Sequence, residues 1–409
     1  MNKYEIRAYI KEHGVQGFSE GVSSLLQGTE LPNGVKIRLQ PRQFSIREMY
    51  EGMVGPLGET PLAVLRESGA LDATGFPTLT EKLLSTEAIA GYTSRPGIAD
   101  VLVPRMVEPR TLTERIPGVT TTEGPKNVLP GEPYPAVGFG DKYVDFEAAL
   151  MNKKDGFLIQ VNEEVIRFDQ TGMIMEAANN AGMQLQTERE RRTVRAVLGI
   201  GSDTGTTIGG VYYPSSVDTP LYLASQNNLR TNATPIYNHP GQTADSKLEN
   251  YTDIQEALTV QAQNVKDDRL LGTQRPIVWN PDRILVPVSL AATVANIFGA
   301  LGVTVINPFT AGTNNELRTM TASNPLTGLF AGMVPQPISS VFVDEVSATM
   351  WVIYDSQRAF VRVNIFPFQT FRSPAGFKWN EDVLFAVKVR EWSRVIAKDF
   401  RVSQRSNGA

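Results

Sequence analysis

The chain has 409 residues, a formal net charge of -4 at pH 7 and no cysteine. Hydrophobic residues make up 41% and charged residues 20%, as is typical of a soluble protein that buries a core. The lack of cysteine excludes disulfides, thiol nucleophiles and thiolate metal sites. The acidic balance argues against tight, non-specific nucleic-acid binding, which needs a basic face.

Residues 1–110 combine short helical patterns with turn-rich pieces. One helical pattern covers Thr80–Ala90, and sequences such as Gly55-Pro-Leu-Gly58 punctuate the segment. The N-terminus carries charges throughout and lacks the apolar stretch of a secretory signal. We interpret this region as an extended N-terminal arm that becomes ordered against neighbouring molecules.

Residues 111–155 have the pattern of a long hairpin. The middle, Thr120–Tyr134, is rich in Thr, Gly and Pro and has no helical period. In Tyr143–Leu150 apolar residues alternate with Asp145 and Glu147, which predicts a strand with one wet face. An unsupported hairpin is marginally stable, so we expect another subunit to supply a partner surface. A further strand is predicted over Gly156–Val161.

Residues 172–198 give the clearest pattern, that of one long helix. Asp169 or Thr171 can cap its start, and Gly199 can close its end. We expect its buried face to contain apolar residues spaced by four, namely Met173, Ala177, Ala181 and Leu185.

Residues 252–332 alternate between helix and strand, beginning with a helix for which Thr252 is the expected cap. No residue of Ile284–Ile306 is charged, and the stretch is long enough to span a bilayer. It contains Pro287, Gly299 and Gly302, however. We therefore predict a soluble strand, helix and strand over residues 283–286, 289–301 and 303–306.

Residues 340–401 are dominated by strand patterns. Val361, Val363 and Ile365 alternate with Arg362 and Asn364, and a second alternating run covers residues 383–390. These patterns predict antiparallel strands of a sheet near the end of the sequence.

The sequence offers little catalytic chemistry. Its only histidines, His13 and His239, lie in turn-rich surroundings without clustered metal ligands. There is no P-loop and no Gly-x-Ser-x-Gly elbow. Adjacent acid pairs such as Asp344-Glu345 do not face one another on a helix or strand, which favours solvated ends over a pair of catalytic acids. A carboxylate-dependent soluble hydrolase is the alternative from another class. We expect no enzyme activity, no cofactor and no metal.

A charge run on the long helix favours a solvated face, because Glu188 and Arg192 are four residues apart in the stabilising order. The alternative is an ion-pair network between subunits. The candidates for inter-subunit contacts on the hairpin and the helix are Lys126, Glu132, Lys153, Lys154, Glu188, Arg189, Arg191 and Arg192.

The order of arm, long hairpin, long helix, α/β segment and closing strands resembles the major capsid proteins of tailed bacteriophages, with their Hong Kong 97-type capsid fold. Three stretches carry the resemblance: residues 131–164, Met173–Gly199, and the strands from Trp351 to Arg401. Some family members cross-link a loop lysine to an asparagine. Lys126 and Asn380 are the nearest candidates, but their neighbours do not match and the cross-link is not carried over.

The resemblance implies an α+β fold divided into an N-terminal arm (1–110), an extended loop (111–155), a peripheral domain (156–250 and 333–409) whose spine helix covers about 172–198, and an axial domain (251–332). It implies self-assembly as hexamers and pentamers into an icosahedral shell around double-stranded DNA, without sequence-specific binding and without a membrane. Assembly would occur in the host bacterial cytoplasm and the product would be the virion capsid. Scaffold, portal and decoration proteins are the further expected partners. An encapsulin-type compartment is the alternative with the same fold.

Overall fold

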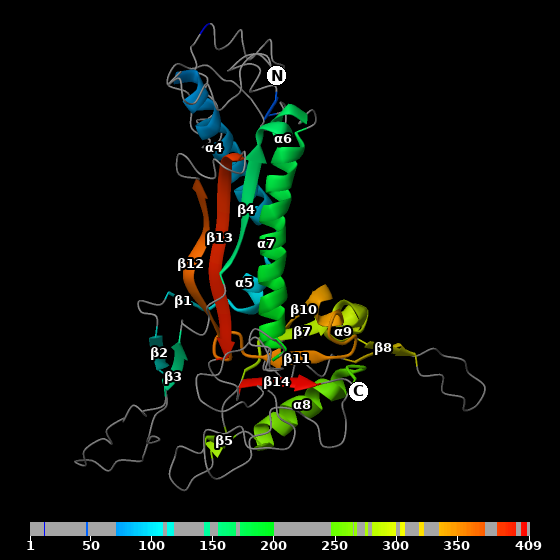
Figure 1. Ribbon diagram of the computed structural model, residues 1–409. Helices are drawn as coiled ribbons and strands as arrows, with labels where there is room; N and C mark the ends of the chain where they lie inside the picture. Colours follow the sequence, from blue (N-terminus) through cyan, green and yellow to red (C-terminus); the bar gives the residue numbers. More distant parts are fainter. Residues whose placement is uncertain are drawn as a thin grey trace, which may run out of the picture. The chain divides into compact units, whose positions relative to one another are not determined.

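The computed structural model describes residues 12, 46–47, 71–108, 113–117, 143–147, 154–168, 172–199, 247–264, 266–267, 275–276, 280–299, 303–306, 319–322, 335–372, 383–397 and 402–406 (Figure 1). The chain divides into two compact units. The first contains Met1–Gly97, Lys153–Arg189 and Phe366–Trp392, and the second contains Ile98–Asn152, Glu190–Ile365 and Ser393–Ala409.

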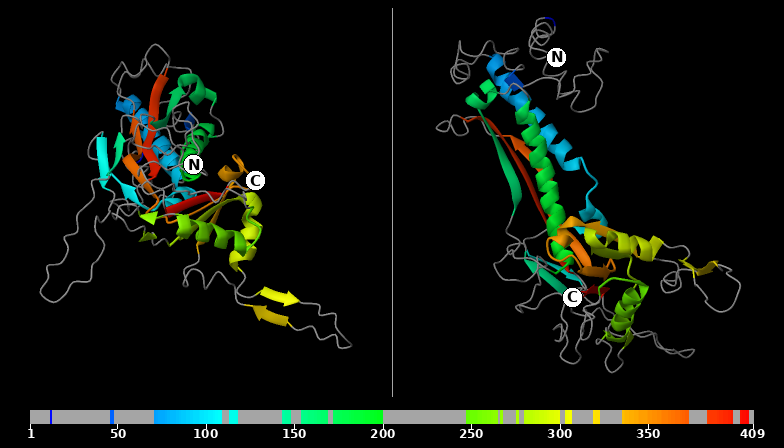
Figure 2. Two further views of the ribbon diagram at one scale, coloured as in Figure 1. Left: turned by 90° about the horizontal axis from the view of Figure 1, so that it is seen from below. Right: turned by 90° about the vertical axis from the view of Figure 1, so that its right-hand side faces the viewer.

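Helices and strands both contribute to the first unit. Helix α4 (Leu71–Thr93) lies beside the long helix α7 (Met173–Val197), as both views of Figure 2 show. Strand β4 (Asp155–Asn162) leads into the short helix α6 (Glu163–Phe168). Gly172 precedes α7 with a φ of 74° and accepts hydrogen bonds from the amides of Met175 and Glu176, so it begins the helix.

One four-stranded sheet has the order β1-β12-β13-β4. Its strands are β1 (Met106–Val107), β12 (Phe360–Arg372), β13 (Val383–Ala397) and β4. Within the first unit, β13 pairs antiparallel with β4, from Val383 opposite Asn162 to Glu391 opposite Asp155. Within the second unit, β1 pairs parallel with β12.

The second unit is built on a sheet of order β10-β7-β11-β14. Its strands are β10 (Gln336–Ser340), β7 (Arg283–Pro287), β11 (Trp351–Tyr354) and β14 (Ser403–Ser406). Strand β7 pairs parallel with β10 and antiparallel with β11. The helices of this unit are α5 (Ile98–Leu102), α8 (Tyr251–Asn264), the 3-10 turn η2 (Val288–Leu290), α9 (Ala291–Gly299) and α11 (Val341–Asp344).

The strands β7 and β11 of that sheet are buried on both faces. Val352 and Tyr354 of β11 pack in one hydrophobic cluster, which also contains the end of α7. Trp351 and Ile353, on the other face, pack in a second cluster with residues of α8 and α9. A sheet covered on both faces reads in the sequence as a continuous apolar run, and the WVIY run of β11 is fully buried.

Several predicted elements are confirmed. The mixed architecture is α+β, and α7 matches the predicted long helix within a residue at each end. The limbs of the predicted hairpin pair antiparallel as β2 (Thr113–Pro117) and β3 (Tyr143–Glu147). The uncharged stretch folds as β7, η2, α9 and β8 (Val303–Ile306), and β8 pairs with β9 (Thr319–Ala322). None of the helices in the described ranges is both long and apolar enough to cross a membrane.

The predicted buried face of the long helix is wrong by one residue. Met173 is 67% exposed and Ala177 is exposed, whereas Ile174 and Ala178 are buried. Of the four predicted core residues, only Leu185 is buried. The face is set by α4, which packs against the row that follows Ile174 at intervals of four.

The cap of α8 is also different from the prediction. The helix begins at Tyr251, and the side chain of Asn250 accepts a hydrogen bond from the amide of Thr252 at 2.8 Å. Asn250 therefore caps the helix, as a side-chain oxygen preceding the first turn can do. Short antiparallel strands β5 (Lys266–Asp267) and β6 (Arg275–Pro276) follow.

Several predictions fall outside the described residues, namely the caps Asp169 and Thr171, both histidines, Lys126, Asn380 and the hairpin's middle, Thr120–Tyr134. The division into arm, loop, peripheral and axial domains stays a prediction.

Candidate functional site

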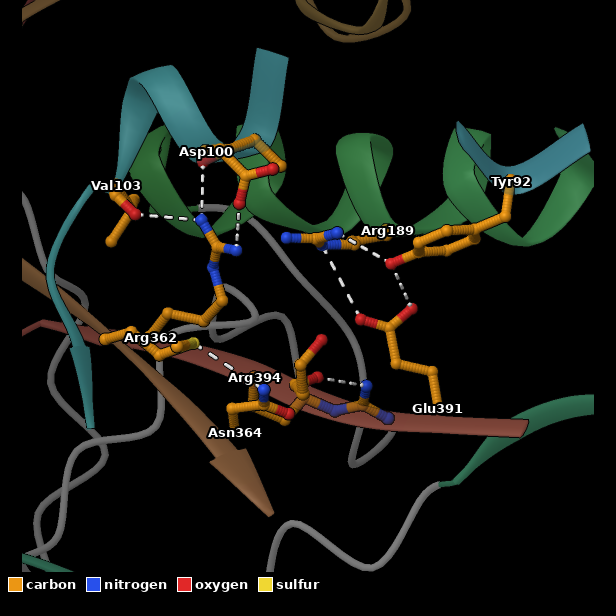
Figure 3. Close-up of polar contacts among 11 residues, drawn as sticks. Tyr92, Asp100, Val103, Arg189, Arg362, Asn364, Glu391 and Arg394 are labelled. Carbon is orange, nitrogen blue, oxygen red and sulfur yellow. Dashed lines mark hydrogen bonds and ion pairs between the residues drawn. The ribbon is translucent and has the colours of Figure 1, made fainter. Parts of the chain in front are cut away.

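A buried polar cluster joins three elements of the first unit (Figure 3). The Tyr92 hydroxyl of α4 donates to Glu391 Oε2 on β13 at 3.0 Å and accepts from Arg189 of α7 at 2.6 Å. Arg189 Nε lies 3.5 Å from Glu391 Oε1, and the Glu391 side chain is only 6% exposed. Each member thus finds partners in the other two, as buried polar groups require.

The environment of the cluster keeps Tyr92 protonated. Burial raises the pKa of the Tyr92 hydroxyl well above its usual range, and the Glu391 carboxylate raises it further, while Arg189 acts in the opposite direction. The Tyr92 ring also lies against Phe368 of β12, with ring centroids 4.3 Å apart. The cluster therefore ties α4, α7 and β13 together through polar contacts.

Close helix packing supports that tie. A Cβ added at Gly182 of α7 would lie 2.1 Å from the carbonyl oxygen of Ala88, and one at Gly91 of α4 would lie 2.0 Å from that of Asn179. The Asn179 side chain donates to the carbonyl of Glu87 at 3.2 Å. Helix α4 therefore docks on α7 with its backbone in direct contact.

Cationic side chains lie against aromatic rings at three places in the same unit. The Arg390 guanidinium lies 4.5 Å from the ring centroid of Phe366 and 4.2 Å from that of Phe371. Lys154 lies 5.0 Å from the Trp392 ring. Such cation–π contacts are each worth about 0.5–1 kcal/mol at exposed sites.

In the second unit, Arg362 of β12 binds the end of α5 (Figure 3). Its guanidinium donates to the carbonyls of Ala99 at 3.0 Å and Val103 at 2.9 Å, and it forms an ion pair with Asp100. Arg362 is 5% exposed. The alternating pattern of this strand gave no sign of this role, in which carbonyls at a helix end attract a cation.

A polar turn connects β11 to β12. Asp282 accepts from both the amide and the hydroxyl of Ser356, each at 2.6 Å. Asp355 Oδ1 accepts from the amides of Gln357 at 3.0 Å and Arg358 at 3.2 Å. Burial raises the pKa of the Asp355 carboxyl, with Asp282 adding to the effect.

Several of the candidate contact residues have partners within their own unit. Arg189 belongs to the cluster with Tyr92, and Arg191 pairs with Glu345 at 2.9 Å. Lys154 contacts Trp392, and Glu188 and Arg192 are half-buried on α7. Their role between subunits stays a prediction, as it does for Lys126, Glu132 and Lys153, which lie outside the described residues.

Sequence patterns missed Tyr92, Glu391 and the role of Arg362, because each partner set comes from distant parts of the chain. Among the residues that the structure describes, no group of His, Asp and Glu is arranged to hold a metal ion. The Asp344 of one predicted acid pair instead accepts from the amide of Val288 at 2.7 Å and Glu345 pairs with Arg191 and Arg195. These carboxylates therefore hold neighbouring segments of the second unit together.

A protein-family model decides the family. The model described as phage capsid protein matches residues 148–401, more than half of the chain. The chain belongs to this family of phage capsid proteins. The recognition made from the sequence is therefore confirmed, and the α+β architecture of the capsid protein is consistent with a Hong Kong 97-type fold.

Solved structures with low sequence identity are similar over most of the capsid protein. A virus-like particle from Pyrococcus furiosus is 12% identical, with a TM-score of 0.40 over 79% of this chain and 98% of that chain. The capsid of Myoviridae phage XM1 is 12% identical, with a TM-score of 0.42 over 73% and 87%. The holo-SrpI encapsulin complex from Synechococcus elongatus is 11% identical, with a TM-score of 0.39 over 76% and 87%. No curated protein matches the chain significantly.

Proposed function

We propose that this capsid protein self-assembles as hexamers and pentamers into the closed icosahedral shell that encloses the double-stranded DNA of a tailed phage. The observation that carries the proposal is the family match over residues 148–401. Assembly takes place in the cytoplasm of the bacterial host, and the mature location is the virion capsid. The protein is a building block and not an enzyme.

The paired limbs of the hairpin support this proposal. Strands β2 and β3 pair from Thr113 opposite Glu147 to Pro117 opposite Tyr143. A two-stranded hairpin is marginally stable in water unless it packs against another surface. In the proposed shell, the hairpin and the N-terminal segment of one subunit lie over its neighbours, which thereby supply that surface.

The charge of the protein suits enclosure better than binding. A formal net charge of -4 at pH 7 gives no general attraction to phosphates. The shell therefore holds DNA by surrounding it, with no need for sequence-specific contacts.

Electron microscopy and size-exclusion chromatography of the purified chain, with and without its scaffold protein, test the proposal. We expect closed shells or hexamer-sized rings, and nuclease-protected double-stranded DNA in shells taken from infected cells. Shells that hold protein cargo and no protected DNA would favour an encapsulin-type compartment. A monomer that does not assemble even with its scaffold protein, and that hydrolyses a substrate, would favour the hydrolase.

Deletion of residues 120–134 tests the role of the hairpin. These residues precede the return limb β3, so we expect the variant to remain soluble, with a native circular dichroism spectrum, and to form no stable shells. Normal shells from this variant would contradict the assignment of the loop.

A further inference from the structure

The segment that leads into the hairpin is held by side chains that come from distant strands of the second unit. Helix α5 has only five residues, so most of its carbonyls must find partners beyond the helix, and that of Ala99 accepts from the amide of Val103 at 3.1 Å. The Val101 carbonyl accepts from Arg283 at 3.4 Å and the Leu102 carbonyl from the Tyr354 hydroxyl at 3.0 Å. The carbonyls of Ala99 and Val103 accept from Arg362.

Arg362 holds the same segment a second time through its backbone. Its amide donates to the carbonyl of Arg105 at 2.9 Å, and Met106 pairs with Arg362 in the parallel ladder of β1 and β12. One residue thus fixes both the end of α5 and the strand that follows it. The next strand of this unit is β2, the outgoing limb of the hairpin, which begins at Thr113.

The chemistry of Arg362 indicates a geometric role. Replacing a buried ion pair by apolar residues is often neutral or stabilising, so a core gains little stability from a buried arginine. Here the partner side chain of Asp100 is 59% exposed, while the Arg362 side chain is 6% exposed and its guanidinium donates to the carbonyls. The planar fork can bind several acceptors at once and thereby fixes the direction of the segment.

We propose that Arg362 is a positioning residue for assembly, which sets the direction of the outgoing limb of the hairpin within the second unit. The inference rests on the proposed shell function. A limb that is already aligned loses less freedom when it settles on a neighbouring subunit, and preorganisation of this kind increases affinity. Loosening it should raise the protein concentration needed for shell formation about tenfold.

The chain has no cysteine, so two introduced cysteines can be labelled without background. Thr113→Cys on β2 and Ala292→Cys, an exposed position on α9, place two spin labels within the second unit. Electron–electron resonance on unassembled subunits then measures the width of the distance distribution between the two labels. The unlabelled proteins provide the concentration at which shells form.

Arg362→Met removes the donors and keeps much of the apolar stem. We expect a broader distance distribution and an about tenfold higher assembly concentration. Arg362→Lys, which retains one cation, should bring both the width and the assembly concentration part of the way back to the wild-type values. Arg358→Met is the matched control, since it removes an arginine from an exposed position of the same unit that is not among the candidate contact residues. The control should change neither measurement.

An unchanged width of the distance distribution in Arg362→Met would overturn the proposal. A broader distribution with a normal assembly concentration would overturn it as well. If Arg362→Met does not fold, Tyr354→Phe serves instead, because it removes the donor to Leu102 and keeps the ring that packs against Phe360. Broadening is expected there too, and its absence in both Tyr354→Phe and Arg362→Lys would overturn the proposal. Failure of the wild-type chain to form shells with its scaffold would instead refute the shell function.

Discussion

Replacement of Gly182 by alanine should destabilise the first unit although alanine is the better helix former. The new Cβ would lie 2.1 Å from the carbonyl oxygen of Ala88 and 2.8 Å from the amide nitrogen of Tyr92. Both atoms belong to the backbone of α4, so no side-chain rotation can make room. Ordinary contact begins at 3.4 Å, and the two helices would have to separate by roughly 1 Å.

The opposing terms can be compared directly. Overpacking of this kind costs about 2 kcal/mol, and separation of the helices weakens the 3.2 Å hydrogen bond from Asn179 to the Glu87 carbonyl, which costs about 1 kcal/mol more. The change from glycine to alanine in a helix returns about 1 kcal/mol. We expect a net loss of about 2 kcal/mol in the free energy of unfolding.

Urea unfolding combined with hydrogen exchange of peptides from α4 and α7 measures this loss. Asn180→Ala is the matched control, because Asn180 is exposed on the same helix and its replacement introduces no contact with α4. The control should be unchanged or slightly more stable. A Gly182→Ala protein as stable as wild type, with unchanged exchange in α4, would refute the packing argument.

Three further substitutions test other described residues. Tyr92→Phe removes the hydroxyl that joins Arg189 to Glu391 and should cost about 1–3 kcal/mol in urea unfolding; no loss would show that the cluster is not a tie. Asp355→Asn keeps an acceptor for its neighbouring amides and removes the desolvated charge. Because the folded pKa of Asp355 is raised, the wild type loses stability as pH rises through the range between the ordinary and the raised pKa. The stability of the variant should therefore match that of the wild type at acid pH and equal or exceed it at neutral pH. Leu185→Asp places a charge at a 3% exposed position and should leave little soluble protein, whereas wild-type solubility would contradict the burial.

Local patterns were sufficient to predict where most elements lie. The long helix was predicted from its period, and the strand-helix-strand order of residues 283–306 from the breakers within an uncharged run. Both depend on neighbours along the chain, which the sequence shows directly. The start of α4 was missed, since Leu71–Thr93 contains Gly75 and Pro77, which conceal a helix in a single sequence.

Packing between distant segments could not be predicted in the same way. On α7, the row Met173, Ala177, Ala181 is as apolar as the buried row that begins at Ile174, and the choice depends on where α4 docks. Arg362 appears in the sequence as the polar member of an alternating strand. Two of its acceptors are backbone carbonyls, which leave no trace in a pattern of side chains.

The long sequence separation of the contacts around α5 also bears on how the protein is made. Asp100 and Arg362 are 262 positions apart, and the Tyr354 hydroxyl meets a carbonyl 252 positions away. At the usual pace of about 5–20 residues per second, the ribosome completes α5 many seconds before its partners emerge. The second unit therefore cannot complete its fold during this time, and its apolar strands stay uncovered. Contacts between residues so far apart in the sequence also form slowly. Each subunit passes through a period in which aggregation competes with folding, and slower synthesis of residues 98–362 should lengthen it.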